Sequence, residues 1–95
     1  MQYKKIKVGK NTIEALCMKL GKKNLIVLKG QKGYVMCGYL NMQAAERFEE
    51  AAVMITGVSS ISGALKSSVH SCSPAAAQLG IRPGQPIREA LKLLA

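Results

Sequence analysis

The chain of 95 residues contains no aspartate, no tryptophan and a single phenylalanine. All five acidic residues are therefore glutamate, which excludes a nucleophilic triad completed by aspartate. The scarcity of aromatic side chains indicates a core built from Leu, Ile, Val, Met and Ala. No apolar run approaches the ~18 residues that a helix needs to cross a bilayer, so no membrane span is expected.

Nucleotide-binding motifs are also absent. The segment 30–33 (Gly-Gln-Lys-Gly) lacks the Walker spacing and the Ser or Thr that should follow its Lys, and no GxGxxG follows a predicted strand. No RNA-recognition or zinc-finger signature is present either. Nucleotide hydrolysis is therefore disfavoured.

The cysteines do not form a disulfide framework. The chain has an odd number of cysteines, Cys17, Cys37 and Cys72, and none of them has CxxC spacing. The first ten residues alternate between basic and apolar side chains, which is unlike a secretory leader. We therefore expect reduced thiols and a cytoplasmic protein.

Length and composition favour one small globular domain spanning residues 1–95. Hydrophobic residues make up 48% and charged residues 20%, as in an ordinary folded chain. A core of this size gives modest stability, which self-association would increase. We therefore expect a symmetric homo-oligomer that uses a sheet edge or an apolar helix face.

The positive charge is concentrated in the first third of the chain. The formal net charge is +9, and residues 1–33 carry nine lysines against Glu14 alone, a local balance of +8. This asymmetry favours nucleic acid or another polyanion as a partner, whereas the alternative is a solvated, lysine-rich sheet face. The candidate anion-binding residues are Lys4, Lys5, Lys7, Lys10, Lys22 and Lys23.

The first forty residues predict an antiparallel meander of four strands. Glycines interrupt short apolar segments at positions 9, 21, 30 and 33, which is typical of hairpins. The predicted strands are residues 2–8, 12–20, 24–29 and 34–40. The last two are apolar nearly throughout and are expected at the buried centre of the sheet.

After residue 40 the apolar residues recur at helical spacing. They predict a helix over residues 44–52 with Asn41 as its N-cap. Two further strands are expected, at residues 53–56 and 69–72. Three further helices are expected: a short one from Ile61 capped by Ser59 or Ser60, one from Pro74 capped by Ser73 and ended by Gly80, and a last one after Pro86. The order predicts a two-layer α+β fold, with helices packed on one face of an antiparallel or mixed sheet.

Cys37 and Gly38 are the most distinctive candidates for a site, together with Asn41. Gly38 interrupts an apolar strand, where it permits a bulge or the close approach of a backbone or ligand. With His70 as a base, Cys37 would be a candidate nucleophile; the alternative is a small buried hydrophobic residue. Cys37, His70 and Cys72 lack the paired spacing and fourth ligand of a structural zinc site, so no metal or cofactor is expected.

Several segments together resemble the YunC-like family, a bacterial and archaeal domain of unknown function. They are residues 32–40 (KGYVMCGYL), Gly57-Val58, residues 79–84 (LGIRPG) and Glu89-Ala90-Leu91, and the resemblance spans residues 10–94. It implies an α+β two-layer fold and supplies no catalytic residues. Asn41 stands where relatives often carry Asp, and the helix after Gly57 is rich in Ser and lacks acidic residues.

Three functions therefore compete. The first is a small self-associating binding or assembly module, which the short chain and the lack of a catalytic set favour. The second is a basic protein that binds nucleic acid or another anion through its lysine-rich third. The third is a small thiol-dependent enzyme that uses Cys37.

Overall fold

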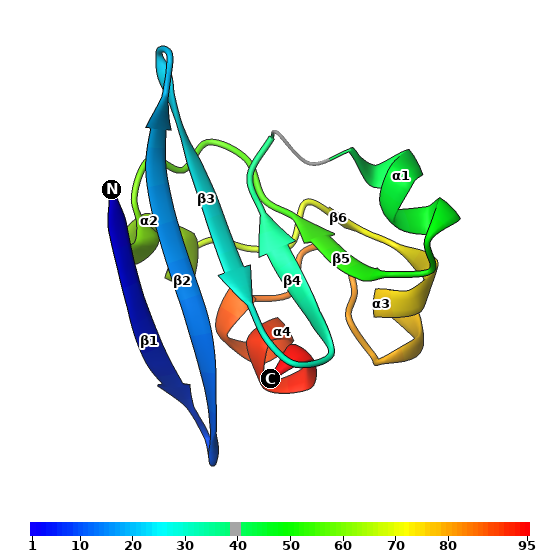
Figure 1. Ribbon diagram of the computed structural model, residues 1–95. Helices are drawn as coiled ribbons and strands as arrows, with labels where there is room; N and C mark the ends of the chain where they lie inside the picture. Colours follow the sequence, from blue (N-terminus) through cyan, green and yellow to red (C-terminus); the bar gives the residue numbers. More distant parts are fainter. Residues whose placement is uncertain (39–40) are drawn as a thin grey trace.

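The structure, a computed structural model, describes residues 1–38 and 41–95, and these residues form a six-stranded mixed sheet with four helices (Figure 1). The strands are β1 (Gln2–Val8), β2 (Asn11–Leu20), β3 (Lys23–Lys29), β4 (Gly33–Met36), β5 (Ala51–Met54) and β6 (Ser71–Cys72). The helices are α1 (Met42–Arg47), α2 (Ile61–Leu65), α3 (Pro74–Gln78) and α4 (Ile87–Leu94). The predicted α+β class is confirmed.

The strands lie in the sheet in the order in which they occur along the chain. Strands β1 to β4 pair antiparallel and form the predicted meander. The chain then passes through α1 and returns as β5, which pairs parallel to β4, and β6 pairs antiparallel to β5. Strand β4 ends at Met36, and the expected continuation to residues 39 and 40 lies outside the described residues.

The helix predicted over residues 44–52 is shorter than expected. It ends at Arg47, and Phe48 and Glu49 follow, the latter with a φ of 57° that breaks the helix. Ala51 and Ala52 belong to β5 instead, where they pair with Gly33 and Tyr34. Alanine continues a helical period but is also small enough for a buried strand, so the pattern placed this boundary wrongly.

The remaining helix starts follow the predicted caps. The Ser60 side chain accepts a hydrogen bond from the Gly63 N–H at 2.9 Å, and Ser73 caps α3, which begins at Pro74. Helix α4 buries the predicted apolar face, which consists of Ile87, Ala90, Leu91 and Leu94.

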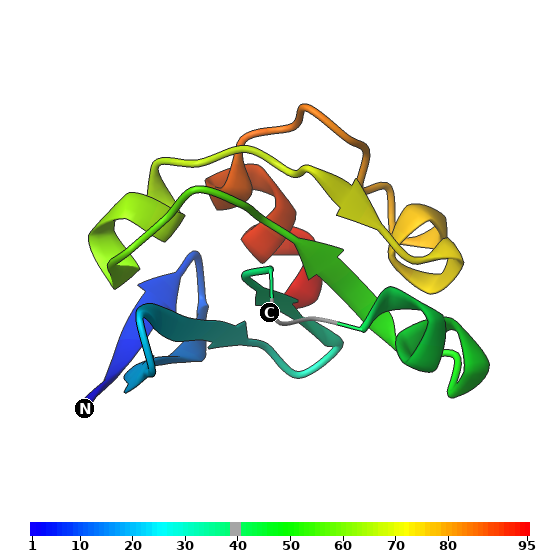
Figure 2. The ribbon, with the colours of Figure 1, turned by 90° about the horizontal axis from the view of Figure 1, so that it is seen from above.

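One face of the sheet holds the hydrophobic core. Ile13, Ile26, Leu28 and Val35 project from it and are fully buried beneath the helices. Figure 2 shows α2 and α4 together on this side of the sheet. Helix α1 instead contacts β5 on the side opposite α3, and its Ala45 is buried outside that core. The outer face of β1 to β4 is left uncovered by the described helices.

The turn between β3 and β4 packs directly against the end of α4. The Lys32 N–H donates to the Leu94 carbonyl oxygen at 2.8 Å. A Cβ at Gly30 would meet the same carbonyl group, and one at Gly33 would meet Ala51 and Leu94. Glycine at these two positions allows this close approach.

Candidate functional site

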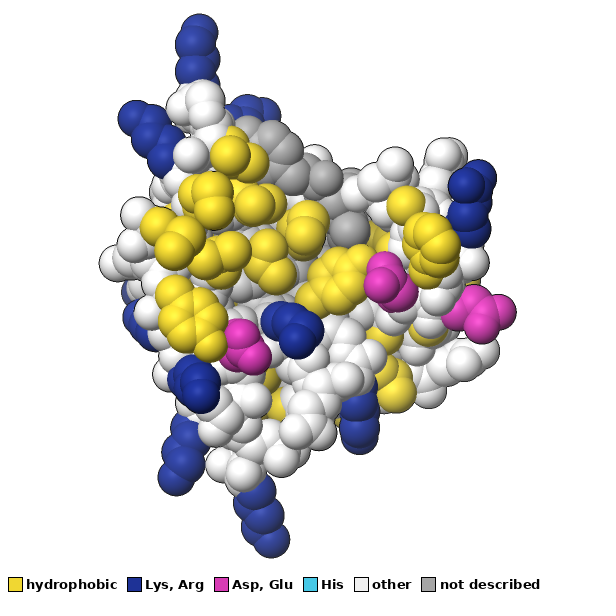
Figure 3. Space-filling model, viewed as in Figure 1, with side chains coloured by type: hydrophobic (Ala, Val, Ile, Leu, Met, Phe, Trp, Pro, Cys, Tyr) yellow, Lys and Arg dark blue, Asp and Glu magenta, His cyan; other side chains and the backbone are white. Residues whose placement is uncertain are grey.

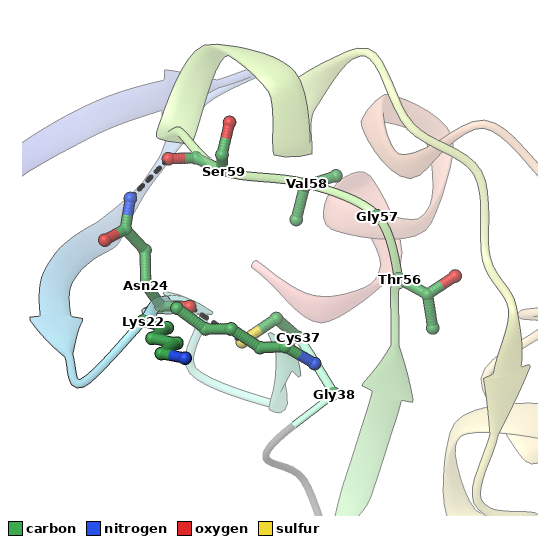
Figure 4. A pocket seen from close by; sticks show the side chains of 9 residues that line it. Lys22, Asn24, Cys37, Gly38, Thr56, Gly57, Val58 and Ser59 are labelled. Carbon is green, nitrogen blue, oxygen red and sulfur yellow. Dashed lines mark hydrogen bonds between the residues drawn. The ribbon is translucent and has the colours of Figure 1, made fainter.

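A pocket of about 520 Å³ opens where the parallel strands β4 and β5 end. Figure 4 shows Asn24, Cys37 and Gly38 along one wall and the loop from Thr56 to Ser59 along the facing wall. Lys22 and Lys23 line the pocket from the β2–β3 turn. Ligands of α/β proteins commonly bind beyond the carboxyl ends of parallel strands, and this pocket has the same position relative to β4 and β5.

The lysines of the pocket are presented by a tight hairpin. Leu20 pairs with Lys23, which leaves Gly21 and Lys22 as a two-residue turn. Gly21 has a φ of 55°, as the favoured hairpin turns require. The turn is tied to the facing wall because the Asn24 side-chain amide donates to the Ser59 carbonyl oxygen at 2.7 Å.

The Cys37 thiol is held by the backbone of β3. It accepts a hydrogen bond from the Ile26 N–H at 3.4 Å and donates one to the Asn24 carbonyl oxygen at 3.5 Å. The residue is only 5% exposed. These contacts are typical of a packed structural thiol rather than an exposed nucleophile.

His70 lies away from Cys37. It is exposed, precedes β6, and donates its backbone N–H to the Met54 carbonyl oxygen. Cys37 follows β4, and β5 runs between the two, so their backbones are about 10 Å apart, two strand spacings. The described residues show no hydrogen bond between the two side chains, and the catalytic pair stays a prediction that this geometry does not favour.

Gly38 lines the pocket, and the packing of the described residues does not require glycine at this position. A Cβ built there would meet no heavy atom of the described residues within 4 Å, and the residue does not have a positive φ. Gly57 on the facing wall also has open space around it, with a φ of 70°. The described residues therefore leave free volume on both sides of the pocket.

The other candidate residues are spread over the molecule. Asn41 is the predicted N-cap, since its side chain accepts a hydrogen bond from the Ala44 N–H at 3.1 Å. Lys10 lies in the β1–β2 turn at the opposite end of the sheet from Lys22 and Lys23. On the edge strand β1, Lys5 and Lys7 lie on the outer face of the sheet and Lys4 lies on the inner face. Only Lys22 and Lys23 of the proposed lysines line the pocket with Cys37 and Gly38.

The outer face of the sheet carries a feature that sequence reasoning missed. The strand register aligns Tyr3, Leu16, Val27, Met36 and Met54 in a single row across five strands. We call this the apolar row. Its members are partly exposed, and Tyr3 is 53% exposed. The run from Leu25 to Leu28 looked like a fully buried strand, but only Ile26 and Leu28 are buried, so the expected burial on both faces is wrong for β3.

A charged row lies beside the apolar row, in the order Lys5, Glu14, Lys29 and Tyr34. The Tyr3 hydroxyl donates to the Glu14 carboxylate at 3.1 Å, and this bond raises the pKa of Tyr3. Burial, and then a 3.0 Å hydrogen bond to Glu50, raises the pKa of Tyr34. Both tyrosines are therefore protonated donors on this face at neutral pH.

A second hollow of about 390 Å³ lies between the ends of α1 and α3 and is lined by Glu46, Glu49 and Glu50. The Glu50 carboxylate already accepts the Tyr34 hydroxyl, and its carbonyl oxygen accepts the Ser73 hydroxyl at 2.7 Å. Within residues 1–38 and 41–95, no three His, Cys or Glu side chains are grouped so that they could hold a metal ion. No described helix is long and apolar enough to cross a membrane.

The fold and pocket define a small α+β domain with a pocket at the ends of its parallel strands and an uncovered sheet face. The chain belongs to the family described as "Domain of unknown function (DUF1805)", which matches residues 36–94. It is 35% identical over 81 residues to "Uncharacterized protein YunC" of Bacillus subtilis (strain 168), covering 81% of this chain and 80% of that protein. The predicted resemblance to YunC is confirmed.

A solved relative shares the whole architecture. The crystal structure of a protein of unknown function, TA1206 from Thermoplasma acidophilum, superposes with a TM-score of 0.95 at 34% sequence identity. The match covers 99% of this chain and 92% of that chain. The six-stranded arrangement is therefore shared with that relative.

Proposed function

We propose that this domain is a self-associating module and that two copies pack against each other through the outer face of the sheet. The apolar row carries the proposal, because within the described chain no helix covers it. Figure 3 shows apolar side chains gathered over β1 to β4 on this face. Exposed apolar patches of this extent are characteristic of interaction surfaces.

The sequence predicted self-association through a sheet edge or an apolar helix face, whereas we propose the outer face of the sheet as the contact surface. The apolar face of α4 is buried in the core and is not available to a partner. The edge strand β1 carries Lys4, Lys5 and Lys7, and lysines on an edge oppose the addition of another strand. Among the described residues, the apolar row on the outer sheet face stays open to a partner.

The charges around this face suit a second copy of the chain. The charged row holds Glu14 between Lys5 and Lys29, so a two-fold arrangement can bring Glu14 of one copy beside a lysine of the other. Figure 3 shows further basic side chains mainly at the margins of the face. An apolar centre with a charged rim is the usual anatomy of a protein interface.

The available area fits a weak dimer. Four strand spacings of about 4.8 Å, and about six residues of about 3.3 Å along each strand, give roughly 400 Å² of flat face per copy. Two copies then bury roughly 800 Å² of flat face, which is below the about 1,200 Å² at which specific, stable interfaces begin. We therefore expect a weak dimer, whose dissociation constant must be measured because buried area does not determine affinity.

Sedimentation equilibrium from about 5 to 200 µM tests the proposal, with Val27→Lys as the perturbation. Val27 lies at the centre of the apolar row and is partly exposed, so lysine there should abolish the dimer while circular dichroism shows a folded chain. Gln78→Lys adds the same charge on the exposed surface of α3 and should leave association unchanged. Leu16→Lys provides a second perturbation of the row.

Salt separates this proposal from binding of a polyanion. Two copies that each carry +9 repel one another, so added salt should strengthen the dimer. Binding of nucleic acid through the lysines should instead weaken as salt is raised. A chain that stays monomeric at about 200 µM in low and high salt would contradict the proposal, as would equal loss of association in the Gln78→Lys control.

A further inference from the structure

We infer that the pocket at the ends of β4 and β5 binds a small phosphate-bearing ligand. Lys22 and Lys23 line it, and none of the described residues that line it is acidic. Glu50, the acidic residue nearest along the chain to this lining, precedes β5, whereas the pocket lies beyond the end of that strand, and the Glu50 carboxylate accepts the Tyr34 hydroxyl. The site is therefore electropositive, which selects for an anion.

The facing wall supplies further donors. The backbone N–H groups of Thr56, Gly57 and Val58 make no hydrogen bond to any other residue that the structure describes. Figure 4 shows the hydroxyl groups of Thr56 and Ser59 pointing away from the cavity, so the donors of this wall are its backbone N–H groups. A phosphate group has several acceptor oxygens, and backbone N–H groups together with lysine ammonium groups are suitable donors for them.

The free space is built into the pocket. A hydrogen bond between Asn24 and Ser59 fixes the distance between the two walls at one end. The fold needs glycine at 30 and 33 to avoid clashes, but at Gly38 an added Cβ would meet no described atom within 4 Å. Glycine at 38 thus keeps open a volume that the described residues do not fill.

The size and lining indicate a ligand larger than phosphate alone. A pocket of about 520 Å³ lies in the range that holds small organic molecules. Val58 and the aliphatic stems of the lysines offer apolar contacts beside the donors. The class that fits is a phosphate monoester with a small organic group.

Nuclear magnetic resonance of the ¹⁵N-labelled chain tests this inference, with inorganic phosphate and glycerol phosphate as probes and sodium chloride at equal ionic strength as the reference. We expect saturable shifts of the Gly38, Gly57 and Ser59 amide signals with both phosphates and tighter binding of the ester. Chloride should not produce saturable shifts.

Matched variants then locate the site. Lys22→Gln with Lys23→Gln should weaken binding about tenfold or more, because two charge-assisted contacts are lost. Lys10→Gln with Lys32→Gln removes the same charge from turns at the opposite end of the sheet and should leave binding unchanged. Gly38→Val should fill the pocket and abolish binding while the thermal unfolding midpoint is retained.

Two results would overturn the inference. One is the absence of saturable shifts at these three amides with either phosphate. The other is an equal loss of binding in both pairs of lysine variants, which would show a general attraction of anions to a basic chain. The substituted lysines are all exposed and lie in turns or at the first residue of β3, so the test stands even if Gly38→Val unfolds the domain.

Discussion

Substitution of Gly33 by alanine tests how tightly the β3–β4 turn is packed. A Cβ at this position would lie 2.7 Å from the Ala51 Cβ and 2.8 Å from the Leu94 Cδ2, and nearer still to the Ala51 carbonyl oxygen. These separations are shorter than van der Waals contact, so β5 or α4 must move. The clash includes backbone, which cannot relieve it by changing a rotamer.

The expected loss of stability is at the upper end of the range for overpacking, about 3 kcal/mol. For a domain of about 100 residues, each kcal/mol lowers the unfolding midpoint by roughly 4–8 °C, so Gly33→Ala should lower it by roughly 12–24 °C. Gly38→Ala is the matched control. An added Cβ there meets no atom of residues 1–38 and 41–95 within 4 Å, and the change in stability should stay within about 0.5 kcal/mol.

Urea and thermal unfolding followed by far-ultraviolet circular dichroism measure both variants under the same conditions. Equal stabilities for Gly33→Ala and the unsubstituted chain would refute the packing argument, because they would mean that the turn does not approach β5 and α4 closely. A large loss in Gly38→Ala would refute the assignment of free space at the pocket.

Two further predictions concern buried polar groups. Ser73→Ala should lower the free energy of unfolding in urea by about 1–3 kcal/mol. Ser73 is 1% exposed, and its hydroxyl group accepts hydrogen bonds from the Ala52 and Ala76 N–H groups and donates one to the Glu50 carbonyl oxygen. A loss smaller than that of an exposed Ser62→Ala control would contradict this role. Cys37 should be the slowest of the three cysteines to alkylate in the folded chain at neutral pH, because Cys17 and Cys72 are more exposed. Burial raises the pKa of the Cys72 thiol, so Cys17 should react first. Mass spectrometry follows the three rates, and a Cys37 that reacted fastest would favour the thiol-dependent enzyme instead.

Local signals predicted most of the secondary structure. Gly9 and Gly21 both adopt positive φ in the hairpin turns where the pattern placed them. The caps at Ser60 and Ser73 and the apolar face of α4 were also predicted, because each depends on residues close together in the chain. The boundary between α1 and β5 was wrong because alanine suits both elements, and only pairing with β4 decides between them.

The sequence predicted several residues of the candidate site but not that they lie around one pocket. Cys37 and Gly38 stood out as an interrupted strand, and Lys22 and Lys23 as a basic turn, but their meeting with the loop 56–59 depends on the parallel pairing of β4 and β5. No local pattern encodes that crossover. The apolar row was missed because a continuous apolar strand does not reveal which of its faces is covered.

The contact between the β3–β4 turn and α4 has a consequence for synthesis of the chain. The meander is complete once residue 36 has been made, yet its inner face is covered in part by residues 87–94, and Lys32 finds its partner only at Leu94. While a ribosome adds the intervening residues, Ile26 and Leu28 lack that cover. The nascent sheet therefore presents apolar surface on both faces, which makes this interval the one in which a chaperone would engage it.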